Sequence, residues 1–192
     1  ILAASLGLSA AELDRSPIGA GGFLEATRST QQVRARRVAG LVAAEQARGV
    51  SVLELVRAFE RAVGLEDAYP GAHFQLAVCH YRRGAMAECS TAARRAIELN
   101  PASAPARYRL AMALFHLGRL DEAASAFEET LAADGEYVIA CYQLGIIRER
   151  LNDDAGAVRC FERVVAANPH DASAHYHLGL GYKRQGVDAL AI

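Results

Sequence analysis

The chain has 192 residues, of which 52% are hydrophobic and 22% are charged, and its formal net charge is −1. This composition is that of a folded protein with a buried core. The near-neutral charge excludes a general binder of nucleic acid or of anionic membranes, because both need a positive field. No apolar stretch is long enough to cross a bilayer, so membrane insertion is not expected.

Residues 1–35 predict an N-terminal helical segment with a glycine-rich hinge. Ser9 and Glu12 have the spacing of a capping box at the start of a short helix. The Gly-Ala-Gly-Gly run at 19–22 predicts a flexible break. No Gly-Lys-Ser/Thr follows this run, so we do not expect a phosphate-binding loop. A longer helical stretch over 23–48 then leads into the rest of the chain.

From residue 70 onward the sequence matches itself when it is shifted by 34 residues. Such a period is typical of helix–turn–helix repeat arrays. It predicts repeats at 70–103, 104–137 and 138–171, with a partial repeat at 172–192. The columns that carry the period are Gly84, Gly118, Asn152 and Gly186; Leu76, Leu110, Leu144 and Leu178; and Ala77, Ala111, Gly145 and Gly179.

Helix starts and stops follow the same period. Ser103 and Asp171 lie where the N-caps of a following helix are expected. Asp121 and Glu122 place negative charge at the start of a helix, which the helix dipole favours. Each predicted repeat ends in a turn dipeptide. These dipeptides are Asn100-Pro101, Asp134-Gly135 and Asn168-Pro169.

Three stretches resemble tetratricopeptide (TPR) repeats: HFQLAVCHYRRGAMAECSTAARRAIELNP, RYRLAMALFHLGRLDEAASAFEETLAAD and CYQLGIIRERLNDDAGAVRCFERVVAANP. The resemblance spans about 70–192, and a degenerate repeat at 36–69 precedes it. It implies an all-α fold, a right-handed helix–turn–helix solenoid of about four to five helix pairs with the last one incomplete. Because the chain starts at Ile1 and stops within a repeat, we expect it to be a piece of a longer protein. TPR proteins as a family imply scaffolding rather than catalysis.

The titratable residues predict no catalytic or metal site. His73 and His80 occupy repeat places that pack inside the helix pair, and His175 and His177 face different directions on a helix. We therefore expect no enzymatic activity, no metal and no cofactor. The cysteines form no CxxC pattern, which favours small buried side chains in a reducing compartment and hence the cytoplasm, with the periplasm left open. The four are Cys79, Cys89, Cys141 and Cys160.

Lys183 is the only lysine among 21 basic residues. We attribute this bias to the codon usage of a GC-rich genome and expect a bacterial source. Arginine also suits planar, bidentate contacts.

The TPR resemblance implies that the first helix of each repeat lines a concave groove through its second, fifth, ninth, twelfth and thirteenth places. Places five, nine and twelve form one stripe along a helix. The ninth place is apolar in every repeat, and the twelfth turns polar at Glu149 and Lys183. The predicted partner-binding residues are Phe74, Val78, Tyr81, Tyr108, Arg109, Met112, Phe115, Tyr142, Ile146, Tyr176 and Leu180.

The groove differs from that of chaperone-binding TPR proteins, which hold a carboxylate pair with Lys, Asn and Arg. The equivalent places here offer Phe74, Gln75, Val78 and Arg109, so that clamp is not expected. Arg109, with Arg150 or Arg184, remains as a partner for an acidic ligand group.

Three hypotheses for function follow. In the first, the groove binds an apolar or amphipathic segment of a partner protein, helical or extended. In the second, residues 1–35 occupy the groove of the same chain or of a second copy, which makes the protein self-occluded or a homo-oligomer. In the third, the chain is the substrate-recruiting arm of a larger enzyme. A competing structural interpretation is that part of the stripe is buried between repeats.

Overall fold

The computed structural model describes residues 51–186, and chain contacts divide the protein into two units, 1–69 and 70–192. Within the described residues there are eight α-helices and no strand. The all-α prediction is therefore confirmed for this part of the chain. The predictions for the segment 1–35 fall outside the described residues. So do those for 36–50 of the degenerate repeat and for the last six residues.

The described part of the first unit is one helix, α4 (Val52–Leu65). Its start is fixed by a capping box, in which the Ser51 hydroxyl accepts a hydrogen bond from the Glu54 amide at 3.3 Å. The Glu54 carboxylate in turn accepts one from the Ser51 amide at 3.0 Å. Such reciprocal caps satisfy two of the free amides at a helix start. The buried residues of α4 lie on one face and are Leu55, Val56, Phe59 and Ala62.

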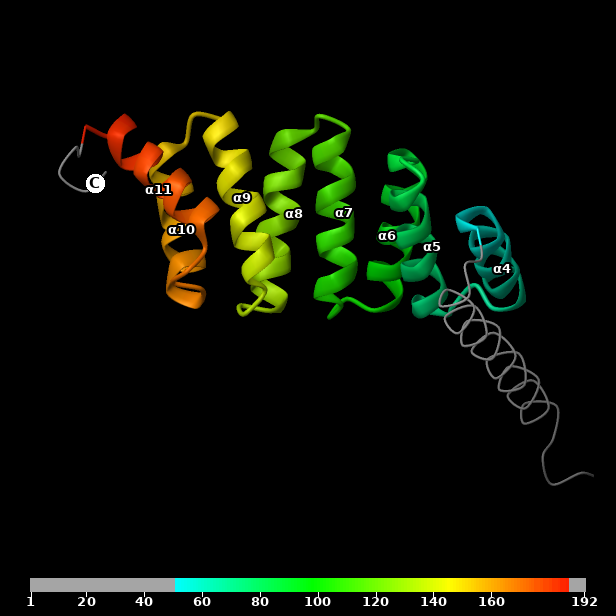
Figure 1. The fold of residues 1–192 in the computed structure, drawn as a ribbon. Helices are drawn as coiled ribbons and strands as arrows, with labels where there is room; N and C mark the ends of the chain where they lie inside the picture. The colour runs from blue at the N-terminus through cyan, green and yellow to red at the C-terminus, as the bar shows by residue number, and fades with distance from the viewer. Residues whose placement is uncertain (1–50, 187–192) are drawn as a thin grey trace, which may run out of the picture. The chain divides into compact units, whose positions relative to one another are not determined.

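The second unit alternates two kinds of helix, shown in chain order in Figure 1. Each first helix packs against its own second helix, and each second helix packs against the next first helix. Corresponding bounds differ by 34 residues, the period of the sequence. The first helices are α5 (Pro70–Arg82), α7 (Ala104–His116), α9 (Val138–Arg150) and α11 (Ala172–Arg184). The second helices are α6 (Met86–Leu99), α8 (Leu120–Ala133) and α10 (Asp154–Ala167).

The predicted N-caps are confirmed. The Ser103 hydroxyl accepts a hydrogen bond from the Ala106 amide at 3.3 Å, and the Asp171 carboxylate accepts one from the Ala174 amide at 3.0 Å. The turn from first to second helix needs a left-handed residue, which glycine adopts without steric cost. The residues at this turn have positive φ and are Gly84 (75°), Gly118 (76°), Asn152 (60°) and Gly186 (73°).

Small residues let the helices approach closely in the core of the second unit. The aromatic anchors Phe127 and Phe161 on the second helices are fully buried. A Cβ atom on Gly145 would lie 2.7 Å from the Phe161 ring, so this place on α9 admits only glycine without a shift of that ring. The third place of every first helix is likewise a buried alanine. These residues are Ala72, Ala106, Ala140 and Ala174.

Candidate functional site

The first helices present a continuous accessible surface, which we call the first-helix stripe. It consists of the second, fifth, ninth, twelfth and thirteenth places of α5, α7, α9 and α11, and none of these residues is fully buried. The third and tenth places of the same helices are buried throughout. Ten of the eleven residues predicted to bind a partner belong to this stripe and are therefore at least partly accessible, and Arg109, at the sixth place of α7, is partly accessible as well. Tyr176 is the most exposed of them, at 65%.

Two of the four fifth-place aromatic rings are held from one side by the second helix of their own repeat. Tyr108 packs edge-on against Phe127, and Tyr142 packs edge-on against Phe161, both with centroids 5.7 Å apart. Phe74 has no such partner because Ala93 occupies the equivalent place on α6. Packing within the repeat explains part of this aromatic column. The half-buried rings still present area to a ligand.

The ninth-place side chains lie between the aromatic places and are all apolar and half-buried. Burial of one such side chain stabilises a complex by roughly 1.5–3 kcal/mol. They form the centre of the stripe along the four helices. These residues are Val78, Met112, Ile146 and Leu180.

Twelfth-place side chains contact the next first helix, 28 and 35 residues further along the chain. Arg109 lies over the ring of Tyr81, 4.7 Å from its centroid, and the Tyr81 hydroxyl is 2.9 Å from Nε2 of His116. One repeat later, Arg150 lies over the ring of Phe115 at 4.8 Å. Both arginines are thus oriented by an aromatic ring of the preceding first helix.

The same contact is ionic between α9 and α11. Glu149, whose side chain is 13% exposed, lies 2.5 Å from Nη2 of Arg184 and 3.0 Å from Nδ1 of His177. Arg184 also binds Asp154 at 2.8 Å. His177 stacks on Phe161 with ring centroids 5.0 Å apart. Arg184 is therefore already held by two carboxylates, unlike Arg109 and Arg150.

A cleft opens at the N-terminal ends of α9 and α11, with a volume of about 440 Å³. Sequence reasoning predicted Tyr142 in this region but missed Ile139, a second-place residue that is 54% exposed. The sequence did distinguish Ile139, because it is the one large apolar residue at a second place. The other second places are Gly71, Pro105 and Ser173. The cleft is lined by Val138, Ile139, Tyr142, Gln143, Val164, Asn168, Asp171 and Ser173.

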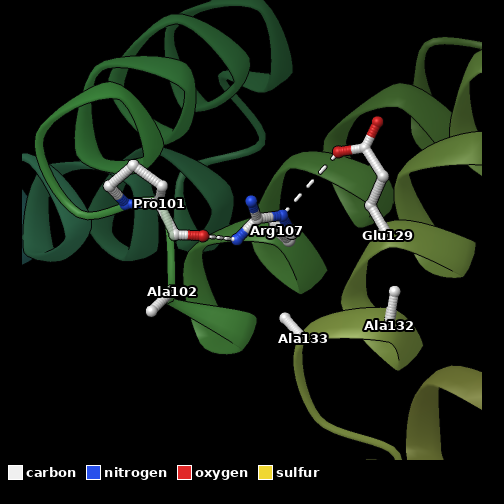
Figure 2. Close-up of a pocket in the computed structure, with 6 residues that line it drawn as sticks. All are labelled: Pro101, Ala102, Arg107, Glu129, Ala132 and Ala133. Carbon is white, nitrogen blue, oxygen red and sulfur yellow. Dashed lines mark hydrogen bonds and ion pairs between the residues drawn. The ribbon is translucent and has the colours of Figure 1, made fainter.

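A second cleft, of about 380 Å³, lies between the α6–α7 loop and the end of α8 (Figure 2). Arg107 spans it, donating a hydrogen bond to the Pro101 carbonyl and lying 3.7 Å from Glu129. The remaining walls are Ala102, Ala132 and Ala133. The Arg107 guanidinium already has partners within the chain. It therefore links the α6–α7 loop to α8 and is not free to bind a ligand.

The cysteines are free and buried, as predicted. Burial raises the pKa of the Cys89 thiol to about 11, and it raises the pKa values of Cys79, Cys141 and Cys160 as well. A thiol with a raised pKa is protonated at neutral pH and is a poor nucleophile.

Two further findings concern only the part of the chain that the structure describes. Residues 51–186 contain no group of three or more His, Cys, Asp or Glu arranged to hold a metal ion. Over the same residues, no helix has both the length and the apolar character that crossing a membrane requires. His73 is buried and His80 is half-buried, as their repeat places predicted.

Two family models match the chain. One describes subunit 3 of the anaphase-promoting complex, or cyclosome, and matches residues 55–130. The other describes the tetratricopeptide repeat and matches residues 118–179. A search of curated protein sequences gave no match.

Solved structures share the fold at low sequence identity. MamA (41-end) from Desulfovibrio magneticus RS-1 is 21% identical, with a TM-score of 0.73 over 82% of this chain and 88% of that chain. YrrB, described as a TPR protein with an unusual peptide-binding site, is 16% identical, with a TM-score of 0.69 over 80% and 77%. A chain of the Naa15/Naa10 complex bound to HypK-THB is 17% identical, with a TM-score of 0.62 over 80% and 23%. At these identities the likeness concerns the fold, a helix–turn–helix solenoid.

Proposed function

Since the chain belongs to the tetratricopeptide-repeat family, we propose that it is a non-catalytic interaction scaffold that binds an apolar or amphipathic segment of a partner protein along the first-helix stripe. Repeat arrays of this kind use extended surfaces to hold other molecules. The observation that carries the proposal is the unbroken run of accessible aromatic and aliphatic side chains over four first helices.

The energetics fit a binding surface of this size. Three or four anchoring side chains support micromolar affinity once the costs of ordering and association are subtracted. Met112 adds a flexible side chain that adapts to different ligand shapes. The cleft beside Ile139 and Tyr142 is the natural place for the largest anchor, because it combines apolar walls with amide and hydroxyl groups.

A pull-down from source-cell lysate tests the proposal. The Met112→Glu/Ile146→Glu variant places two carboxylates in the centre of the stripe and should lose the partner that the wild type captures. The control is Ala87→Glu/Ala155→Glu, which adds the same charge on second helices at exposed places where α8 already has Asp121. All variants are first shown to fold by circular dichroism. Equal capture by the stripe variant and the wild type would move the interaction to another surface.

The rival hypothesis, residues 1–35 in the stripe, concerns residues outside the described part of the chain. The apolar spacing of Leu2, Leu6 and Leu13 motivates it. Deletion of 1–35 distinguishes the two. An open stripe predicts unchanged binding of a hydrophobic dye after the deletion, whereas a stripe covered by this segment predicts a clear increase.

A further inference from the structure

Charge is distributed unevenly between the two kinds of helix. The four first helices contain seven Arg or Lys residues and one acidic residue, Glu149. The three second helices contain four Arg residues and eight Asp or Glu residues. The net charge of −1 for the whole chain conceals this separation. A surface with an excess of one sign attracts ligands of the opposite sign and repels those of its own.

Some first-helix cations have acidic partners on the chain, and others do not. Arg107 contacts Glu129, Arg148 contacts Glu128 and Asp153, and Arg184 contacts Glu149 and Asp154. Among residues 51–186, no acidic side chain forms an ion pair with the remaining four first-helix cations. These are Arg82, Arg109, Arg150 and Lys183.

Arg109 and Arg150 are the best placed of the four to bind a ligand. Each lies over an aromatic ring, Tyr81 or Phe115, so one face of the guanidinium is fixed. Within the described residues, Nε of Arg109 is buried and has no hydrogen-bond partner. A buried donor without a partner costs stability. A carboxylate is the planar anion that accepts two parallel guanidinium hydrogen bonds.

The apolar and basic groups lie at opposite ends of α9, whereas Arg109 is at the sixth place of α7 and its guanidinium lies over Tyr81, near the end of α5. On α9, Ile139 and Tyr142 line the cleft near the N-terminus, Ile146 follows, and Arg150 ends the helix. At 1.5 Å per residue, Ile139 and Arg150 are about 16 Å apart along the axis. A ligand that covers this helix must therefore be apolar at one edge and acidic at the other.

We propose that the occupant of the first-helix stripe is an acidic amphipathic segment of another protein. Its apolar side chains cover the ninth places and the Ile139 cleft, and its carboxylates bind Arg109 and Arg150. This inference rests on the proposed function, because it specifies the chemistry of the ligand that the stripe binds.

A random-peptide library displayed on phage tests the chemistry without knowledge of the natural partner. The library is selected against the whole chain, and the enriched peptides are sequenced and synthesised. We expect enriched peptides to combine apolar residues with an excess of Asp and Glu. Arg109→Gln/Arg150→Gln should lower their affinity by about tenfold and weaken its dependence on salt. Arg109→Lys/Arg150→Lys should restore part of the affinity.

The matched control is Arg94→Gln/Arg159→Gln, which removes two exposed arginines from second helices and should leave affinity unchanged. Enriched peptides without an acidic excess, still lost with Met112→Glu/Ile146→Glu, would overturn this inference and leave the proposed function standing. Peptides that bind that stripe variant as well as the wild type would overturn both. Equal weakening by the two arginine pairs would also overturn the inference, since it would show a general charge effect.

Discussion

The junction between α5 and α7 and the junction between α9 and α11 place equivalent residues in contact but use different chemistry. Tyr81 meets a guanidinium and an imidazole, whereas Glu149, at the equivalent place, meets an imidazole and a different guanidinium. In both cases the partners are 28 and 35 residues further along. The backbone repeat therefore decides which places meet. The side chains decide whether the contact is aromatic or ionic.

The two junctions also differ in what they leave for a ligand. Arg109 lies over the ring of Tyr81, and among the described residues no acidic side chain forms an ion pair with it. Arg184 uses its donors on Glu149 and Asp154. The aromatic junction therefore orients a cation without neutralising it, and the ionic junction neutralises its cation.

The largest expected effect is a loss of stability when the buried phenylalanine ring that packs near each junction is removed. Phe161→Ala should lower the free energy of unfolding by about 3–5 kcal/mol, because the ring is fully buried. Phe127→Ala is the matched variant. Phe161 should cost more, since it contacts both Tyr142 and His177, whereas Phe127 contacts Tyr108 alone among the aromatic pairs of the described residues. Urea unfolding measures both, and a smaller loss for Phe161→Ala would contradict the comparison.

A middle-sized effect should separate the ionic from the aromatic junction. Glu149→Gln should lower stability by about 1–2 kcal/mol, because it removes the carboxylate beside His177 and one of the two carboxylates that hold Arg184 in a partly buried site. Tyr81→Phe removes only a hydroxyl and should cost about 1 kcal/mol. The Glu149→Gln loss should shrink in high salt and the Tyr81→Phe loss should persist. Identical salt dependence in thermal unfolding would remove the distinction.

The smallest expected effect is a loss of stability in alkali near the aromatic junction. Burial raises the pKa of Cys89 from 9.0 to about 11 in the folded protein. Between these pH values the unfolded chain releases the thiol proton and the folded chain keeps it, so stability falls as pH rises. The loss should be reduced in Cys89→Ala. Unfolding midpoints measured from pH 8 to 11 check the slope, and equal slopes for both proteins would contradict it.

The sequence predicted the features that depend on local chemistry. Helix caps at Ser103 and Asp171 follow from side chains within a few residues, and the structure confirms them. The TPR resemblance implied which places of each first helix line a groove, and the structure leaves those places at least partly accessible. These properties repeat because each repeat solves the same packing problem.

The features that sequence reasoning missed depend on how neighbouring helices are offset. Ile139 lines a cleft only because α10 and the start of α11 lie beside α9. Arg184 was a candidate ligand-binding cation, and only the structure shows it held by Glu149 and Asp154. The 35-residue spacing of Tyr81–His116 and Glu149–Arg184 was present in the sequence. This spacing indicates a contact only when the offset between successive first helices is known. The second helix between them sets that offset.

Corresponding helices begin and end at the same place in every 34-residue period, which has a consequence for the deletion of a whole period. Loss of residues 104–137 would place Arg150 where His116 now meets Tyr81, and a guanidinium is an acceptable neighbour for that ring. Loss of 138–171 would bring Arg184 to Phe115 in the same way. Either deletion would therefore leave a compatible residue at the 35-residue contact between successive first helices. The length of the binding surface can evolve separately from the contacts that hold it together.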